Sequence, residues 1–194
     1  MRYHYFIIFF FIFTISCVPK AFLLDQPQLL SVYFDRKIKN LEKNDMPSID
    51  DQRDLIRTKV EYGFGVIMEQ ADRLIDMDYY SAIDKYKEAN IVFKEARDLG
   101  ILVLNRKYPL FDDWLRNEAK IKFIKNDVID LYWLAAAYGG TIGSSRGNPF
   151  ELIHLPSVGR LLRKCIELDP EWNNGAIYSA MMSFTATRSD LSAV

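Results

Sequence analysis

Apolar residues recur along this chain with the three- and four-residue spacing of α-helices. One run covers residues 131–138, a second covers 155–169, and a third extends from 172 to 184. The positions that share a helical face in the first two runs are Leu131, Leu134, Ala135, Tyr138, Leu155, Val158, Leu161, Leu162, Cys165 and Ile166. After residue 17 no stretch alternates between apolar and polar residues as a half-buried strand would. The pattern therefore predicts an all-α fold.

The residues between the first two runs predict how their helices connect. We expect Gly139 and Gly140 to end the first helix, and residues 139–149 to form a long turn before the second. In this turn Arg146 and Asn148 are expected to hydrogen-bond exposed carbonyls at helix ends. The two helices and their turn form an antiparallel hairpin, and the third run begins another.

Two further helices are predicted near the start of the chain. One spans residues 29–41, and after a break at 44–47 a long helix spans 51–76, capped by Ser48 or Asp50. The residues expected to form the buried sides of these two helices are Leu30, Phe34, Ile38, Leu41, Val60, Phe64, Ile67, Ala71 and Leu74.

The middle of the chain predicts a third long helix and a shorter one. The long helix covers residues 79–105 and is expected to bend near Gly100. The shorter helix opens at residue 112 or 113 and continues through 119. Residues 126–127 are then expected to cap the helix of the 131–138 run.

Two segments near the C-terminus are similar to parts of a tetratricopeptide repeat. Residues 162–170, LRKCIELDP, resemble the close of a repeat's second helix, where Pro170 disfavours helical geometry at Asp169. Residues 172–178, WNNGAIY, have the Trp-x-x-Gly-x-x-Tyr spacing found where such repeats open. Residues 79–89 have a weaker similarity to a repeat's second helix. The chain has no strict repeat period, so we expect a degenerate array of antiparallel helical hairpins. No capping helix follows the third run, and the array is expected to be truncated at its C-terminus.

The N-terminus predicts an export signal and a lipid anchor. Arg2 precedes an apolar run over residues 6–13, which is shorter than the roughly 20 residues that span a bilayer. Ser16 and Cys17 follow, and this ending resembles the lipobox of bacterial lipoproteins, in which the cysteine is acylated. Thr14 stands where a lipobox usually has leucine. The alternative is a plain secretory signal with an incidental cysteine.

These features predict three parts of the chain. Residues 1–16 form a signal peptide, residues 17–28 form a tether that begins with the lipidated Cys17, and residues 29–194 form the helical domain. Two or three acyl chains give stable anchoring, whereas a single one is marginal. We therefore expect the protein in the bacterial cell envelope, facing the periplasm and anchored to a membrane by lipid.

Composition and charge are typical of a globular domain. Hydrophobic residues make up 49% of the chain and the formal net charge is -1; removal of the signal peptide leaves about -2. Nucleic acid is not indicated as a partner. If Cys17 is acylated, Cys165 is the only thiol left, so no internal disulfide can form. Cys165 lies on the apolar side of its helix, which favours a buried structural role over a nucleophile.

Two motifs point to enzymes but lack the necessary context. Residues 143–147 match G-x-S-x-G, the nucleophile motif of hydrolases, yet that motif follows a strand and here it follows a helix. Ser145 has no convincing triad partner, since His154 is the only histidine after the signal peptide. Glu151 and His154 lack further metal ligands at matching spacing. We therefore expect no catalytic residue, no metal and no cofactor.

The same region offers candidates for a ligand-binding cleft. A cleft between helices is usually lined by aromatic residues with a few polar groups. The candidates are Trp133, Tyr138, Arg146, Asn148 and Arg160. Arg146 and Arg160 are the charges that suit a carboxylate or an anionic headgroup. The alternative is that the aromatic residues form core, which is the commoner use of such side chains.

From about residue 48 to 191 the chain resembles a known transport family. Four blocks in a fixed order carry the resemblance, and their order is more specific than any one of them. The blocks are FGVIMEQADRLIDMDYYSAIDKYKEA (64–89), ARDLGILVLNRKYPLF (96–111), DLYWLAAAYGGTIG (130–143) and LPSVGRLLRKCIELDPEWNNGAIYSAMM (155–182). They are similar to the T-component of tripartite ATP-independent periplasmic (TRAP) transporters. Members of that family generally continue for further helices.

The resemblance implies a lipid-anchored accessory protein that docks a periplasmic solute-binding protein. It further implies self-association as a homo-oligomer, a trimer in particular, and an apolar channel for a hydrophobic or carboxylate ligand. An alternative is a helical-repeat scaffold for protein interactions without a small-molecule ligand. A serine hydrolase is the least favoured hypothesis, because its motif lacks the strand that the chemistry needs.

Overall fold

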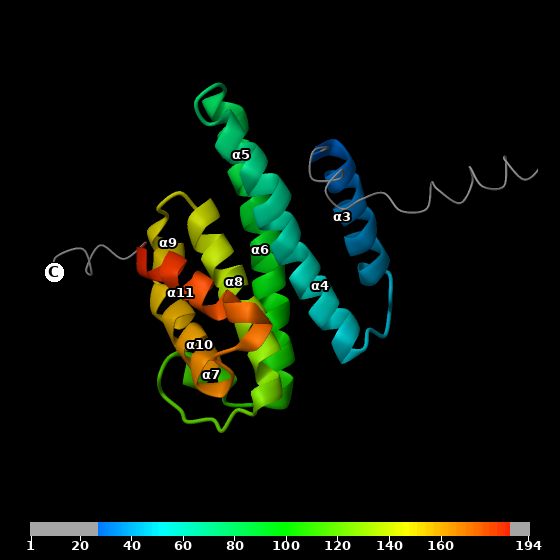
Figure 1. The fold of residues 1–194 in the computed structure, drawn as a ribbon. Helices are drawn as coiled ribbons and strands as arrows, with labels where there is room; N and C mark the ends of the chain where they lie inside the picture. The colour runs from blue at the N-terminus through cyan, green and yellow to red at the C-terminus, as the bar shows by residue number, and fades with distance from the viewer. Residues whose placement is uncertain (1–26, 187–194) are drawn as a thin grey trace, which may run out of the picture.

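The computed structural model describes residues 27–186, and these residues form helices and short connections without a strand (Figure 1). The predicted all-α class is confirmed for this part of the chain. The signal peptide, Cys17 and most of the tether lie outside the described residues. Within residues 27–186 no helix combines the length and hydrophobicity that crossing a membrane requires.

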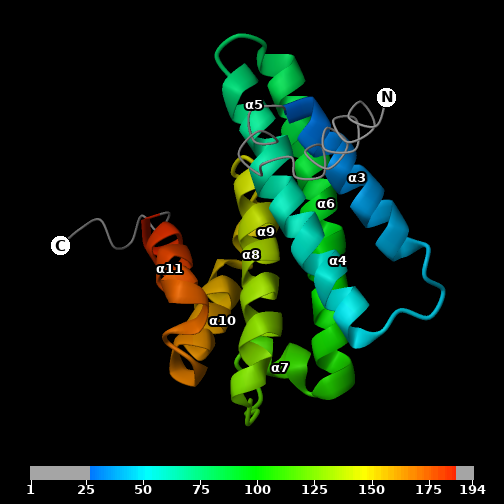
Figure 2. The same ribbon diagram turned by 45° about the vertical axis from the view of Figure 1, so that its right-hand side comes forward.

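The long helices lie side by side and alternate in direction (Figures 1 and 2). They pack in chain order, α3 on α4, α4 on α6, α6 on α8, α8 on α10 and α10 on α11. The elements are α3 (Pro27–Glu42), α4 (Ile49–Tyr62), a π-helical segment (Gly63–Met68), α5 (Glu69–Leu74), α6 (Tyr79–Lys107), α7 (Phe111–Leu115), a 3-10 turn (Lys125–Asp127), α8 (Val128–Ser144), α9 (Pro149–Leu152), α10 (Leu155–Leu168), a second 3-10 turn (Trp172–Gly175) and α11 (Ala176–Ala186). This arrangement is compatible with the expected array of hairpins.

The first hairpin follows the predicted boundaries closely. Ser48 caps α4, because its hydroxyl accepts a hydrogen bond from the backbone N–H of Asp51, and Asp51 accepts one from the backbone N–H of Ser48. Ser48, rather than Asp50, is thus the cap. Leu30, Phe34 and Ile38 of α3 pack against the core.

The predicted helix 51–76 contains a feature that its spacing did not reveal. Between α4 and α5 the backbone is π-helical over Gly63–Met68, so one turn holds an extra residue and the faces shift. Val60, Ile67 and Ala71 are buried as predicted, but Phe64 is 42% exposed. The prediction that Phe64 is core is therefore wrong, and the π segment is the physical reason.

The long helix α6 passes through Gly100 without interruption. We predicted a bend to account for a glycine at position 100. Burial of Gly100 against α8 accounts for this glycine without a bend. A Cβ at this position would lie 3.2 Å from the Leu134 side chain. The small residue thus permits close approach of the two helices.

The predicted end of the helix at Gly139 and Gly140 is wrong. Both residues have ordinary negative φ, and α8 continues to Ser144. A Cβ at Gly140 would overlap the ring of Phe93, so this glycine serves packing rather than termination. The long turn predicted over 139–149 is in fact a short connection over 145–148.

Two of the later helices, α7 and α11, are shorter than predicted. The predicted helix from residue 112 or 113 to 119 is α7, which ends at Leu115, and α10 matches its prediction. The helix expected from Trp172 begins only at Ala176, since Asn173 and Asn174 adopt positive φ in the preceding 3-10 turn. The aromatic opening of the repeat-like motif therefore precedes α11.

Two apolar clusters form the core, and α8 contributes to both. One lies between α3, α4 and α6 and includes Val60 and Phe93; the other joins α7, α8, α10 and α11 and includes Phe111, Leu131 and Leu161. Burial of these clusters is the main stabilising contribution in a domain without a disulfide among its described residues.

Ion pairs fix the start of α8 against its neighbours. Arg53 of α4 donates from Nε and Nη2 to the two carboxylate oxygens of Asp130, at 2.7 and 2.8 Å. The fully buried Asp127 accepts hydrogen bonds from Lys107 Nζ and Tyr108 Oη, both at 2.5 Å, and from the Ile124 backbone N–H. Such two-oxygen pairing with arginine fixes orientation as well as distance.

Candidate ligand groove

An apolar groove of about 450 Å³ lies between α4, the π segment, α8, α10 and α11. Its volume is in the range of small-molecule sites. The residues that line it are Val60, Glu61, Phe64, Tyr132, Trp133, Ala135, Ala136, Gly139, Ile142, Gly143, Leu155, Val158, Leu162, Ala180, Ser183 and Phe184. Aliphatic, aromatic and small residues dominate this set.

The floor of the groove is one side of α8. Trp133, Ala136, Gly139 and Gly143 recur at the spacing of a helical face, and the small residues leave room above the helix. At Gly139 a Cβ would meet no neighbouring atom within 4 Å. The groove thus exists because α8 carries small residues on its open side.

The two walls come from distant parts of the chain. Val60, Glu61 and Phe64 form one wall, and the register shift of the π segment is what exposes Phe64 there. The other wall belongs to α10 and α11, with residues such as Leu162 and Phe184. The Phe64 ring also contacts the buried ring of Phe93 in a tilted arrangement, with 4.6 Å between the ring centroids, and Phe93 thereby supports this wall from behind.

The lining has little charge. Within residues 27–186, Glu61 is the one charged side chain of the lining, and Arg57 Nε lies 3.4 Å from the Glu61 carboxylate. Among the described residues, no arginine or lysine lines the groove. The described lining therefore suits an apolar group. A described cation near the groove is Arg57, which pairs with Glu61.

Of the five predicted cleft residues, only Trp133 lines this groove. Tyr138 is buried in the core, where its ring lies 5.3 Å from that of His154 and 5.7 Å from the Arg97 guanidinium. Burial raises the pKa of Tyr138 to about 12, so its hydroxyl stays protonated. Tyr138 follows the alternative interpretation, that of a core aromatic.

Arg146 and Asn148 lie in the turn after α8, outside the groove. The Arg146 guanidinium stacks over the ring of Tyr86 at 4.7 Å. The Asn148 side chain caps α9 by accepting a hydrogen bond from the Phe150 N–H, at 3.0 Å. Both residues stabilise the turn, but not through the helix-end carbonyls that we expected.

Arg160 lies on α10 in a separate polar hollow. It donates from Nη1 to the side-chain oxygen of Asn117, and Arg163 and Lys164 lie beside it. The five candidates therefore do not converge on one site. The residues that sequence reasoning missed are Phe64, Glu61 and the open glycines, because their exposure depends on the π segment and on which helices cover α8.

The enzyme-like motifs have structural roles here. The Ser145 hydroxyl donates to the Ile142 carbonyl at 2.7 Å, which places it at the end of α8 rather than on a strained turn. Glu151 is buried and binds Lys94 at 2.8 Å and Arg97 at 3.4 Å. Burial, with the nearby Arg97 charge, lowers the pKa of His154. The part of the chain that the structure describes holds no cluster of three metal-ligating side chains.

Cys165 is fully buried among apolar residues of α10 and its neighbours. Burial raises the pKa of its thiol to about 12, so the reactive thiolate is suppressed. The predicted structural role of this cysteine is confirmed.

Comparison with known protein families identifies the family to which this chain is similar. Residues 56–192 match the family described as TRAP transporter T-component. The match covers more than half of the 194 residues and includes every helix from the middle of α4 to α11. No curated protein matches the chain.

Proposed function

The chain belongs to the TRAP transporter T-component family, and we propose that it docks a periplasmic solute-binding protein and holds an apolar ligand in the α8 groove. The family is one of transport accessory components of the bacterial envelope and not an enzyme family. The predicted role as a TRAP accessory component is thus confirmed at that level. Docking and ligand handling are the proposal.

The observation that carries the proposal is the groove itself. It has about 450 Å³ of space, a floor of small residues and aromatic side chains at Phe64 and Trp133. Between the hydrophobic and the carboxylate ligand that we expected, the lining favours the hydrophobic one, since Glu61 repels an anion. A ligand with both parts would place its carboxylate near Arg57 and its chain along α8.

Lipid anchoring at Cys17 is part of the same proposal. Removal of residues 1–16 and acylation of the cysteine would tether the helical domain to a membrane, facing the periplasm. Mass spectrometry of the N-terminal peptide tests this directly, because acylation adds a defined mass at Cys17. An unmodified cysteine in protein purified from membranes would exclude the anchor.

The docking surface that we propose is the turn between α5 and α6. It projects beyond the ends of the other helices (Figures 1 and 2) and exposes Met77, Tyr79 and Tyr80, the last with 82% of its surface accessible. Aromatic residues and methionine are enriched at protein interfaces. A solute-binding protein could bury these exposed side chains in an interface.

Crosslinked pull-down from the native envelope tests the partner. We expect a solute-binding protein to co-purify with the wild type and to be recovered at least about fivefold less with Tyr80→Ala, a loss of about 1 kcal/mol. Phe150→Ala, which changes another exposed ring, serves as the matched control. Absence of any solute-binding protein from the wild-type sample would contradict docking.

Native mass spectrometry of the purified protein tests the ligand. We expect an apolar molecule to remain bound to the wild type and to be lost in Gly139→Leu, because the new side chain fills open space in the groove. Gly65→Leu is the control, since a Cβ there also meets no atom but Gly65 does not line the groove. The same spectra report the number of subunits and so test the proposed trimer. A wild-type groove that is always empty would favour the scaffold alternative.

A further inference from the structure

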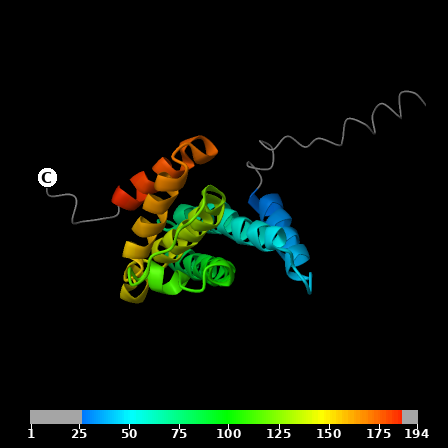
Figure 3. The same cartoon turned by 90° about the horizontal axis from the view of Figure 1, so that it is seen from below.

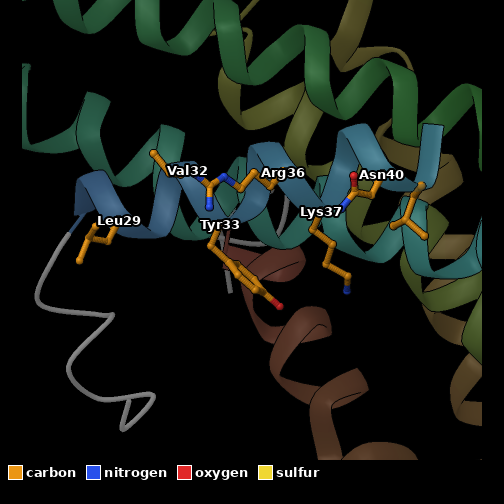
Figure 4. A pocket seen from close by; sticks show the side chains of 7 residues that line it. Leu29, Val32, Tyr33, Arg36, Lys37 and Asn40 are labelled. Carbon is orange, nitrogen blue, oxygen red and sulfur yellow. The ribbon is translucent and has the colours of Figure 1, made fainter. Parts of the chain in front are cut away.

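The outward side of α3 is a surface that no other described element covers. α3 is an edge helix that packs on α4 and the π segment through its predicted apolar side. On the opposite side Leu29, Val32 and Tyr33 are 49%, 45% and 51% exposed. A shallow hollow of about 560 Å³ lies here, and the described side chains that line it belong to α3 (Figure 4).

The second half of the same side is basic. Arg36 and Lys39 are exposed, and Lys43 follows at the end of the helix. Within residues 27–186 none of these three cations forms an ion pair, and the nearby Glu42 pairs at 2.6 Å with Lys59, which also pairs with Glu95. The outward side of α3 therefore carries basic side chains that no described carboxylate pairs with, next to an apolar patch.

The order of these residues fits one kind of occupant. Leu29, Val32, Tyr33 and Arg36 lie at i, i+3, i+4 and i+7, so they form one strip along the helix. Apolar residues with a tyrosine, followed by long basic side chains, are the composition of helices that lie in the surface of a bilayer. Tyrosine prefers the headgroup level, and arginine and lysine extend to the phosphates.

The position of α3 in the chain favours a membrane over a protein partner. Pro27, where α3 begins, follows Cys17 by ten positions, which is at most about 35 Å of extended chain. An acylated Cys17 would hold α3 near the bilayer, so that even a weak contact becomes intramolecular and is largely occupied. α3 also lies before the residues that match the family, which begin at 56.

We propose that the outward side of α3 binds the surface of an anionic bilayer, with Leu29, Val32 and Tyr33 among the headgroups and Arg36 and Lys39 at lipid phosphates. The proposal rests on the lipid anchoring described under the proposed function. α3 and the α10–α11 pair lie at opposite edges of the molecule (Figures 1 and 3). The contact would therefore hold the α10–α11 edge away from the membrane.

Hydrogen exchange of the full chain in vesicles tests this contact. The acylated protein is reconstituted into phosphatidylcholine vesicles with or without phosphatidylglycerol, and amide exchange over residues 28–41 is compared with that in detergent micelles. We expect anionic vesicles to slow exchange about tenfold, as for a contact that is occupied roughly nine-tenths of the time. The slowing should fall to less than about twofold in Leu29→Gln/Tyr33→Gln and in Arg36→Gln/Lys39→Gln.

The matched control is Phe150→Gln/Ile153→Gln, which changes two exposed apolar residues at α9 and its C-terminal end and should leave exchange over α3 unaltered. Equal exchange in vesicles and micelles would overturn the proposal. So would slowing that rises with protein concentration, which indicates a second copy, or slowing that needs an added solute-binding protein. Absence of the acyl mass at Cys17 would also overturn it.

The same samples keep this inference separate from the proposed function. Native mass spectrometry measures groove occupancy and the pull-down measures partner recovery. Neither experiment measures the contact of α3 with the membrane. An occupied groove with unprotected α3 would refute the membrane contact alone. A protected α3 with an empty groove and no recovered partner would refute the proposed function alone.

Discussion

Gly139 and Gly140 are neighbours in α8, yet they lie on different sides of the helix and have different uses. At Gly140 the ring of Phe93 lies where a Cβ would be, and the same ring also contacts Gly63 of the π segment. At Gly139 the space above the helix is empty and belongs to the groove. The comparison teaches that one glycine allows dense packing between helices, while the other keeps a cavity open.

The largest expected effect on the free energy of unfolding comes from Phe93, whose ring packs against Gly140 of α8. Phe93 is fully buried between α4, the π segment and α8, so Phe93→Ala should lower the free energy of unfolding by about 4 kcal/mol. Urea denaturation of the full chain measures this change. Phe150→Ala, at an exposed ring, should change it by less than about 0.5 kcal/mol. If Phe93→Ala lowers the free energy of unfolding by less than about 1 kcal/mol, the Phe93 ring does not stabilise the packing of these helices.

Alanine at the two glycines should act with opposite sign. Gly140→Ala forces the Phe93 ring to move and should cost about 2 kcal/mol of unfolding free energy. Gly139→Ala meets no atom and should add up to about 1 kcal/mol, because alanine favours a helix over glycine. Thermal or urea unfolding of the two variants side by side measures the difference. Equal destabilisation by both would mean that the two sides of α8 do not differ in packing.

The start of α8 depends on charge rather than on small residues. Asp127→Asn removes the ion pair with Lys107 and weakens the hydrogen bond from Tyr108, and should cost about 2 kcal/mol near neutral pH. Burial acts to raise the pKa of Asp127, but the bonds from Lys107, Tyr108 and the Ile124 N–H outweigh it and lower that pKa.

Because the folded pKa lies below that of the unfolded chain, the contribution of Asp127 is present above the ordinary aspartate range. It is lost as the pH falls through the folded pKa. Urea unfolding of wild type and Asp127→Asn across acid pH measures this dependence. The difference between the two proteins should shrink toward low pH, and a difference that grows on acidification would contradict the assignment.

The smallest expected effect is at the turn after α8. Arg146→Ala removes the stacking on Tyr86 and should cost about 0.5 kcal/mol of unfolding free energy. Since Arg146 does not line the groove, ligand retention in native mass spectrometry should equal that of the wild type. If ligand is lost with Arg146→Ala but retained with Gly139→Leu, the ligand binds at the turn after α8 and not in the groove.

Only one predicted cleft residue, Trp133, was placed in the groove by the fold. Sequence reasoning included Trp133 because clefts between helices are usually lined by aromatic residues. It could not identify Phe64, since a regular helical period assigns that ring to the core and the π segment moves it. Arg146, Asn148 and Arg160 are polar residues near α8 in the chain but not in its groove.

The positions of most helices follow from their local sequence. Local chemistry is sufficient for this, as at Ser48, whose side chain caps its own helix, and at Asp169, where α10 gives way before a proline. Whether a glycine ends a helix, permits close packing or keeps a groove open depends on what lies against it. Phe93 lies against Gly140 and nothing lies against Gly139, and only the tertiary structure decides this because the contacting residues are distant in the chain.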